Sequence, residues 1–456
     1  MKTHLDWSDY QNSGLGDAYA DIPKTGGDFA KAIAVCINSQ QCEKKDKGVM
    51  CPSFRVTDES MLSTGGRVKL LKKALNGELG PLPFTDPELH RIMKLCLACK
   101  GCKRECESEV DMAQIKIEYL AQLHEELGTP VRAKLFGNVS SLLDKYPLVS
   151  TLIRSRNRQP WLAKLGETFL GISATRRLPE PSAARYSRAD IATSTRNNDD
   201  AKQEVVLFID TFTRFYEPQN AQAAINVLVA AGYHVYIADI ALDDSERPLC
   251  CGRSMLGNGL VSQAKQEAER TLSALLPHAA AGRPILGLEP SCLLAIRDDY
   301  RSLGLGEEAE LVAQSAILFE EFMAKESTAK RIKLNFNSLN DNKPILVHGH
   351  CHQKAVGAMK AMRKVLKLLP NTQFQLIEST CCGMAGSFGI EAEHADISKQ
   401  MAELSLLPAI RQQPDAHVIA NGFSCRHQIK DGCNHQAMHI AVLLEKSLMA
   451  TKEPGL

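Results

Sequence analysis

The triplet CCG occurs twice in this chain, at residues 250–252 and 381–383, and each copy lies inside a longer matching stretch. PLCCGRSMLGNG resembles STCCGMAGSFG, and further along GLEPSC resembles ANGFSC. The triplets begin 131 residues apart, and Cys292 and Cys425, which close the second pair of stretches, are 133 residues apart. A repeat that keeps its internal spacing predicts two structurally equivalent lobes.

Both halves of the repeat alternate β-branched runs with helical patterns. In the first half, strands are expected at EVVLFID, YHVYIAD and RPILGLEPSC; in the second, at KPILVHGHCH, TQFQLIESTCCG and AHVIANGFSC. Strands that alternate with helices indicate a parallel sheet. We therefore predict α/β lobes over residues 204–325 and 343–450, joined by residues 326–343. The lobes form the second part of an α+β multidomain chain.

A different cysteine pattern occupies the N-terminal part. In CLACKGCKREC, Cys96, Cys99, Cys102 and Cys106 are separated by two, two and three residues. This spacing is typical of bacterial ferredoxins, in which three close cysteines bind one cluster and the fourth binds a second cluster. The spacing favours iron–sulfur over zinc, because zinc sites usually use two separated pairs. Residues 28–135 are thus predicted to form an α-helical, ferredoxin-like dicluster domain.

The second cysteine run that this pattern requires lies upstream, in CINSQQCEKKDKGVMCP. Here Ser39 occupies the middle position between Cys36 and Cys42, and Cys51 follows. Exchange of the fourth ligands gives one complete set, which consists of Cys51, Cys96, Cys99 and Cys102, and one set of three, which consists of Cys36, Cys42 and Cys106. The incomplete set would hold a three-iron cluster, or a four-iron cluster completed by Ser39, another side chain or solvent.

Cysteines of the CCG lobes form the third candidate group. The second lobe offers Cys351, Cys381, Cys382 and Cys425, and the first offers Cys250, Cys251 and Cys292, with about Phe212 at the position of Cys351. Four thiols make the second lobe the favoured site for a third metal centre, iron–sulfur or zinc. The alternative is that these cysteines are small core residues. Cys433 has no equivalent and is expected to be structural.

Three histidines alternate in HGHCHQKA. In an extended segment, His348, His350 and His352 would share one face and Cys351 would point to the other. We consider His350 and His352 as proton carriers or ligands, or as hydrogen-bonded structural groups. Glu289, in EPSC, is a further candidate proton carrier.

Charge, hydropathy and missing motifs exclude several functions. The formal net charge is +1, so no broad electrostatic surface for nucleic acid is expected. No apolar run is long enough to span a bilayer, and the N-terminus does not resemble a signal peptide. These features predict a cytoplasmic protein, either free or attached to the inner face of the membrane. No G-x-G-x-x-G follows a strand, so no FAD is expected in this chain. Residues 1–25 are expected to be a loose arm, residues 136–203 a helical connector and linker, and residues 176–203 the linker proper.

These stretches together resemble known iron–sulfur proteins. GVMCPSFRVTDE, CLACKGCKREC, CCGRSMLGNG, HGHCHQKA and CCGMAGSFG resemble the iron–sulfur half of FAD-linked D-2-hydroxyacid dehydrogenases of the D-lactate and D-2-hydroxyglutarate type. The CCG repeats also resemble iron–sulfur subunits of glycolate oxidase and anaerobic glycerol-3-phosphate dehydrogenase, and heterodisulfide reductase B subunits. The resemblance implies an oxidoreductase subunit that passes electrons from a partner FAD-dependent dehydrogenase subunit, through two clusters, to an acceptor such as a quinone.

Two other functions stay open at this stage. One is a thiol enzyme that reduces disulfides at the CCG cysteines, as in heterodisulfide reductase. The chain departs from that pattern, because Ala295 and Gln428 stand where a C-x-x-C pair would place its second cysteine. The other is a scaffold in which the CCG cysteines hold structural zinc.

Overall fold

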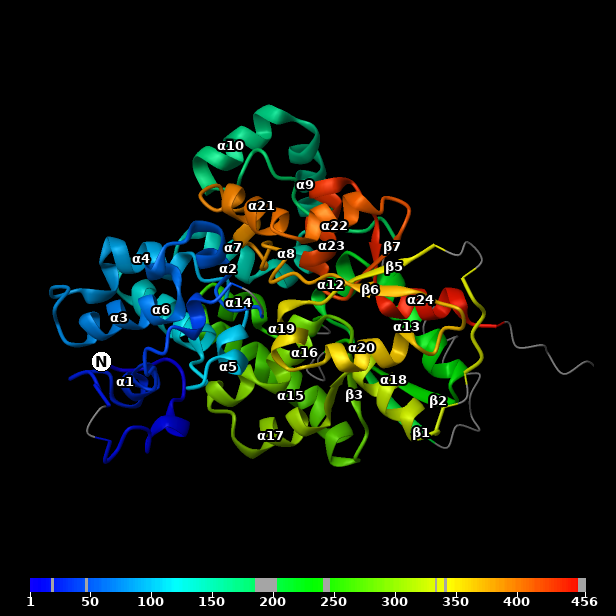
Figure 1. Cartoon of the computed structure of the whole chain (residues 1–456), viewed down its shortest axis with the longest axis horizontal. Coiled ribbons are helices and arrows are strands. Elements are labelled where there is room, and N and C mark those ends of the chain that lie inside the picture. Colours follow the sequence, from blue (N-terminus) through cyan, green and yellow to red (C-terminus); the bar gives the residue numbers. More distant parts are fainter. Residues whose placement is uncertain are drawn as a thin grey trace, which may run out of the picture.

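The computed structural model describes residues 1–17, 20–45, 48–184, 203–240, 247–332, 334–339 and 343–449. A helical N-terminal part lies on one side of the molecule, and two parallel sheets with their helices lie on the other (Figure 1). The expectation of a mixed chain with two parallel-sheet α/β lobes is therefore confirmed.

Short helices separated by cysteine-bearing loops form the N-terminal part. They are α1 (Gly27–Ala34), α2 (Pro52–Thr57), α3 (Thr64–Leu75), α4 (Pro87–Lys94), α5 (Gly101–Glu105) and α6 (Met112–Leu127). Three begin at side-chain caps, because Ser63, Asp86 and Asp111 each accept a hydrogen bond from a backbone N–H three residues later. In MAQIKIEYLAQLHEEL the apolar residues recur at helical spacing, which predicts a helix, and these residues form α6.

Four helices then connect this part to the first lobe: α7 (Val131–Gly137), α8 (Val139–Lys145), α9 (Leu148–Arg158) and α10 (Pro160–Leu170). Helices α9 and α10 form a projection at the top of the molecule (Figure 1). Most of the expected linker lies outside the described residues. Its first residue, Arg176, is only 1% exposed and donates hydrogen bonds to Gly389 and Gln428 of the second lobe.

The two lobes have the same strand order. The first contains β1 (Gln203–Phe208), β2 (Tyr233–Ala238), β3 (Ile285–Gly287) and β4 (Ala316–Leu318), in the order β2-β1-β3-β4. The second contains β5 (Ile345–His348), β6 (Phe374–Leu376), β7 (His417–Ala420) and β8 (Ala437–Met438), in the order β6-β5-β7-β8. All described pairings within these sheets are parallel, so the repeat seen in the sequence is a repeat of topology.

Helices cover both sheets. In the first lobe they are α12 (Thr211–Phe215), α13 (Pro218–Ala230), α14 (Arg253–Gly257), α15 (Val261–Ala280), α16 (Pro290–Arg297), α17 (Gly306–Ser315) and α18 (Phe319–Thr328). In the second they are α19 (Cys351–Ala355), α20 (Met359–Leu366), α21 (Ala395–Glu403), α22 (Leu406–Gln412), α23 (Phe423–Cys433) and α24 (Ile440–Ser447).

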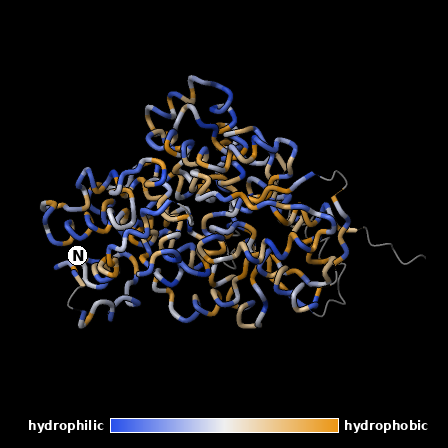
Figure 2. The backbone as a smooth tube through the Cα atoms, viewed as in Figure 1, coloured by the Kyte–Doolittle hydropathy of each residue, from blue (hydrophilic) through white to orange (hydrophobic). Residues whose placement is uncertain are grey.

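Hydrophobic cores run across the boundaries between these parts. One core contains Phe29 and Leu71 of the N-terminal helices together with Val206 and Phe208 of β1. A second joins the opposite face of β1, through Val205, to Val347 of β5. Hydrophobic segments lie along the buried strands, and hydrophilic ones follow the outer loops (Figure 2). Strands buried on both faces explain why the strand sequences are continuously apolar rather than alternating.

Two expectations about the fold were wrong, and two short strands were not expected. Residues 1–25 are not a loose arm, because Leu5 and Trp7 are each 4% exposed and the Trp7 indole donates to Glu118 over 3.1 Å. Residues 392–412, where the alternation of strands and helices predicts one helix between TQFQLIESTCCG and AHVIANGFSC, form two helices, α21 and α22. The short strands β4 and β8 were missed, because two or three residues carry no measurable periodicity.

Candidate metal centres

The loop between α4 and α5 gathers three thiols in seven residues. Two of its residues adopt left-handed backbone conformations, Ala98 at φ 48° and Lys100 at φ 58°. Cys96, Cys99 and Cys102 are each less than 9% exposed. The turns fold the loop back so that all three side chains reach one small cavity.

Cys51 joins this cavity from 45 residues upstream. It precedes α2 with a left-handed φ of 49°, and its sulfur receives contacts from the Thr64 N–H at 3.1 Å and the Thr64 hydroxyl at 3.2 Å. Arg67, 1% exposed, lies beside it and donates to the Ile92 carbonyl and the Ser53 hydroxyl. The cavity is lined by Cys51, Pro52, Ser53, Thr64, Arg67, Cys96, Leu97, Ala98, Cys99, Lys100, Cys102, Met112 and Ala113. The structure thus brings together the four cysteines predicted as one set.

Burial raises the pKa of three of these thiols, so they are poor acids on their own. It raises the pKa of Cys51 to about 11, against the opposing effects of Arg67 and the Thr64 hydrogen bond. Burial also raises the pKa of Cys99 and Cys102 well above the ordinary value. A metal cation in the cavity would lower the pKa of these thiols again, because soft metals bind the thiolate form. Four converging sulfurs in a buried cavity fit a metal cluster.

The loop between α1 and the short 3-10 helix Gln41–Glu43 repeats the same backbone path. Asn38 and Gln40 both have φ 57°, two and four residues after Cys36, just as Ala98 and Lys100 follow Cys96. By this correspondence Ser39 takes the position of Cys99. Ser39 is exposed in the structure, whereas Cys99 is buried.

The incomplete set of three cysteines is also brought together. Burial raises the pKa of Cys36, and the neighbouring Cys106 and Cys42 thiols add to the effect. The Gly65 N–H donates to the Cys42 sulfur at 3.4 Å. Cys106 follows α5 and therefore reaches the loop that carries Cys36 and Cys42, as the exchange of fourth ligands requires.

In the second lobe, four thiols form a continuous chain of contacts. Cys351 contacts Cys381, Cys381 contacts Cys382, and Cys382 contacts Cys425. Cys351 begins α19 and Cys425 lies in the first turn of α23, so two of the thiols lie at helix N-termini. All four residues are less than 9% exposed.

His348 completes this group, and sequence reasoning gave it no separate role. One ring nitrogen lies with the sulfurs of Cys382 and Cys425 in a group whose ligand atoms are all within 4.8 Å of one another. Its Nδ1 contacts the Ser379 hydroxyl at 2.8 Å, and its buried Nε2 has no hydrogen-bond partner among the described residues. Sulfur and imidazole donors in this arrangement fit an iron–sulfur cluster or zinc.

The first lobe has a smaller thiol group. Cys250 contacts Cys251, and Cys251 contacts Cys292. Phe208 pairs with Gly287 in the first sheet, and His348 pairs with Ala420, the equivalent of Gly287, in the second. Phe208 therefore corresponds to His348, and Thr211, rather than Phe212, corresponds to Cys351. The Thr211 hydroxyl donates to the Cys250 sulfur at 3.6 Å. A hydroxyl has therefore replaced the fourth thiol.

The expected extended arrangement of the histidines was wrong, because the chain becomes helical at Cys351. His350 caps α19, where its Nδ1 accepts the His352 N–H at 3.2 Å. Burial lowers the pKa of His350 to about 3 and that of His352 well below its ordinary value. The His352 Nε2 lies 3.1 Å from the carbonyl oxygen of Ala98, in the N-terminal cysteine loop.

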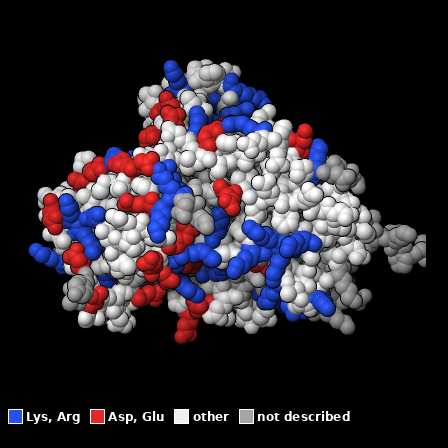
Figure 3. All heavy atoms as spheres, in the orientation of Figure 1, with Lys and Arg blue, Asp and Glu red and all other residues white. Residues whose placement is uncertain are grey.

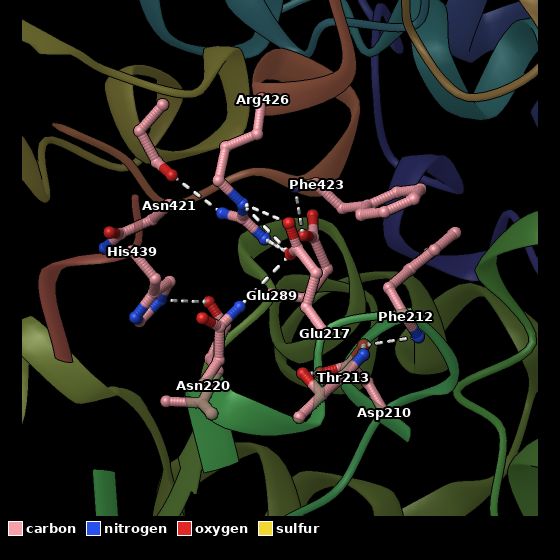
Figure 4. Close-up of polar contacts among 12 residues, drawn as sticks. Asp210, Phe212, Thr213, Glu217, Asn220, Glu289, Asn421, Phe423, Arg426 and His439 are labelled. Atoms are coloured by element: carbon pink, nitrogen blue, oxygen red, sulfur yellow. Dashed lines mark hydrogen bonds and ion pairs between the residues drawn. The ribbon is translucent and has the colours of Figure 1, made fainter. Parts of the chain in front are cut away.

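Glu289 lies at the boundary between the lobes (Figure 4). It caps its own helix α16 through Ser291, and it also accepts the Phe423 N–H at the start of α23 at 2.7 Å. Burial and the nearby Asp210 raise the pKa of Glu289 to about 7. Beside it, Arg426 of the second lobe pairs with Glu217 of the first.

Buried ion pairs connect the N-terminal cysteine loop to the first lobe. Lys100, 4% exposed, pairs with Asp298 and Asp299 at the end of α16. Burial opposes its charge, but the two carboxylates hold the pKa of Lys100 above its ordinary value. Cys433, in contrast, only donates to the Ile429 carbonyl at 3.1 Å and joins none of these groups.

Comparison with known proteins supports the resemblance inferred from the sequence. Residues 345–430 match the family model described as CCG, a cysteine-rich domain. The chain is 24% identical to D-2-hydroxyglutarate dehydrogenase of Escherichia coli over 84% of its own length, and it spans 40% of that relative. It is 22% identical to the glycolate oxidase iron-sulfur subunit of the same organism, covering 87% of this chain and 91% of the relative.

A third relative is one of the subunits of anaerobic glycerol-3-phosphate dehydrogenase of Escherichia coli, 23% identical over 69% of this chain and 75% of the relative. The chain thus spans about two fifths of the hydroxyglutarate dehydrogenase and most of the two subunits. These relatives are oxidoreductases or their subunits, which supports a general oxidoreductase role. No helix among the described residues is long and apolar enough to cross a membrane.

Proposed function

We propose that this chain is an iron–sulfur electron-transfer subunit. It would pass electrons from a partner FAD-dependent 2-hydroxyacid dehydrogenase to an acceptor such as a quinone. The observation that carries the proposal is the convergence of Cys51 with Cys96, Cys99 and Cys102 in one buried cavity. The near-complete coverage of a relative named as an iron-sulfur subunit supports the same reading.

Two cysteine sets of the N-terminal part would hold the clusters. Cys51, Cys96, Cys99 and Cys102 suit a [4Fe-4S] cluster, and Cys36, Cys42 and Cys106 suit a [3Fe-4S] cluster or a four-iron cluster with a non-thiol ligand. When bound, such clusters supply one-electron transfer. The repeated left-handed turns of the two loops support a ferredoxin-like arrangement over residues 28–135.

Protein groups around the first set are arranged to favour negative charge. Thr64 offers two donors to Cys51, and the Gly101 N–H donates to Cys99. Arg67 places a buried guanidinium beside the cavity. Donors and cations of this kind stabilise thiolates and tune the potential of a bound cluster.

Residues of the second lobe would hold a third centre, either iron–sulfur or zinc. Its donors would be Cys351, Cys381, Cys382 and Cys425, with His348 beside them. The complete burial of these thiols favours a metal over disulfide chemistry, because a catalytic thiol must be reached by its substrate. Lys354, half-buried beside them, would balance the charge of the thiolates.

The decisive experiment uses anaerobically purified protein and its cognate flavoprotein. We expect about seven irons or more per chain, from one four-iron and one three-iron site. Substrate should reduce the flavoprotein, and this chain should then carry electrons to a quinone analogue. Cys99→Ala should abolish that transfer and leave flavin reduction intact, while Cys433→Ala, outside every thiol group, should change neither.

Two results would reject the proposal. Stoichiometric zinc at the Cys96–Cys106 loop, with no iron after reconstitution, would indicate a structural site. Disulfide reduction without any flavoprotein, lost in Cys382→Ala, would place the protein among thiol enzymes.

The type of the second cluster can be tested separately. Ser39→Cys restores the thiol found at the equivalent position of the other loop. It should convert a three-iron EPR signal into a four-iron one, or lower the potential of an existing four-iron cluster. An unchanged spectrum and potential would show that Ser39 does not correspond to Cys99.

A further inference from the structure

Helices α9 and α10 are unusual in burying almost nothing. Among their described residues, α9 has no buried side chain and α10 has only Ala163. The two helices pack against each other and project from the body of the molecule (Figure 1). A helix pair that buries so little of its own surface would gain stability from another surface.

Large apolar side chains are concentrated on this projection. Trp161, Leu165 and Phe169 are 61%, 45% and 78% exposed. They recur every four residues, so they form one stripe along α10, about 12 Å long. On α9, Leu148 and Leu152 are 74% and 66% exposed and are likewise one turn apart. We call these five residues the hairpin apolar set.

Cations accompany the hairpin apolar set. Residues 145–170 contain five basic residues and one acidic residue, whereas the whole chain has nearly equal numbers of each. Arg154 and Arg156 donate to carbonyl oxygens of the chain, which leaves Lys145, Arg158 and Lys164 exposed. The one acid, Glu167, accepts the Ala174 N–H. Lys and Arg are prominent on this projection (Figure 3).

We infer that the α9–α10 hairpin docks the protein on an anionic lipid bilayer, with Trp161, Leu165 and Phe169 inserted at the boundary between headgroups and acyl chains. Amphipathic helices that combine Trp, Phe and Leu with Lys and Arg lie in the membrane interface in this way. Exposed cations pair with anionic headgroups. A projecting pair of helices suits insertion into a bilayer better than it suits binding in the groove of a partner protein. The inference does not depend on the proposed clusters or on the flavoprotein.

Sedimentation of the full chain with lipid vesicles tests this inference. Binding should be at least about tenfold stronger to vesicles that contain phosphatidylglycerol than to phosphatidylcholine alone. The triple variant Trp161→Ser, Leu165→Ser, Phe169→Ser should lose at least about tenfold in binding. A matched control, Leu82→Ser with Leu311→Ser and Leu404→Ser, removes scattered exposed apolar residues and should bind like the unmodified protein.

The charges can be tested in a second variant. Lys145→Gln with Arg158→Gln and Lys164→Gln should remove most of the preference for phosphatidylglycerol. All of these side chains are exposed, so circular dichroism of the variants should be unchanged. Retained preference for phosphatidylglycerol would contradict the role given to these cations.

Fluorescence provides an independent readout, because the chain has only two tryptophans. Trp7 is 4% exposed and Trp161 is 61% exposed. Vesicles should shift the emission to the blue, and Trp161→Phe should remove the shift. Absence of vesicle binding would overturn the inference. So would equal binding by the triple Ser variant, or a triple variant that impairs only association with the flavoprotein, which would make this face a protein interface.

Discussion

The two CCG lobes share one topology but differ at positions that correspond to the metal donors proposed for the second lobe. Thr211 of the first lobe stands where the second has Cys351, and Phe208 stands where the second has His348. The second lobe therefore gathers four thiols and an imidazole, and the first gathers three thiols and a hydroxyl. One topology can therefore carry two different donor sets, which differ here at two equivalent positions.

The largest expected difference concerns metal content. Cys382→Ala should remove the metal that we propose for the second lobe, because Cys382 contacts both Cys381 and Cys425. Cys251→Ala, its counterpart, should leave metal content unchanged. Iron and zinc analysis of the two variants measures this, and equal losses would mean that both lobes hold metal.

A gain of function in the first lobe should be the next largest effect. Thr211→Cys restores a four-thiol set beside Cys250, Cys251 and Cys292. We expect additional bound iron or zinc after reconstitution, up to one further centre per chain. Thr213→Cys, on the same short helix, is the control. A Thr211→Cys protein with unaltered metal content would show that the fourth thiol is not what the first lobe lacks.

The glycines of the two triplets should differ in their tolerance of a side chain. Gly252 and Gly383 have φ of 73° and 83°, so alanine costs about 1–2 kcal/mol at either position. At Gly383 a Cβ would also lie 2.3 Å from the Ser398 carbonyl oxygen, against 3.1 Å from that of Ala264 at Gly252. Urea unfolding should show the larger loss for Gly383→Ala, and the reverse order would contradict the packing described.

Glu289 should produce an effect that is seen only as a change in pH dependence. Its pKa is raised from 4.5 to about 7, so the folded state holds this proton more tightly than the unfolded state. The free energy of unfolding should therefore fall as pH rises from about 5 to about 8, by at most about 3 kcal/mol. Glu289→Gln should flatten this slope. In the second lobe the position equivalent to Glu289 is Gly422, which carries no titrating group. Parallel pH profiles of Glu289→Gln and the unmodified protein would refute the assignment of this proton to Glu289.

Much of the fold followed from local patterns. Helix α6 and the central strands β1 and β5 were predicted because each has a sustained period or a continuous apolar run. The packing of Trp7 against Glu118 was not, because nothing in the local sequence names a partner 111 residues away. Period and composition report on local structure, whereas the choice of partner depends on the assembled chain.

The candidate sites divide in the same way. Spacing alone grouped Cys51 with Cys96, Cys99 and Cys102, because exchange of ligands between two cysteine runs has a regular pattern. Spacing could not reveal the position of His348 relative to Cys382, which depends on the parallel pairing of β5 with β6 and β7. Nor could it show that His350 serves as a helix cap.

Lys100 has a consequence for the rate at which electrons could cross the protein. It lies between Cys99 and Cys102, and its ammonium is enclosed with Asp298 and Asp299. Separating the N-terminal loop from the lobes would strand these buried charges, at a cost of several kcal/mol. These ion pairs would hold the cluster proposed at Cys99 at a fixed distance from the first lobe, and electron transfer through that cluster should be insensitive to solvent viscosity.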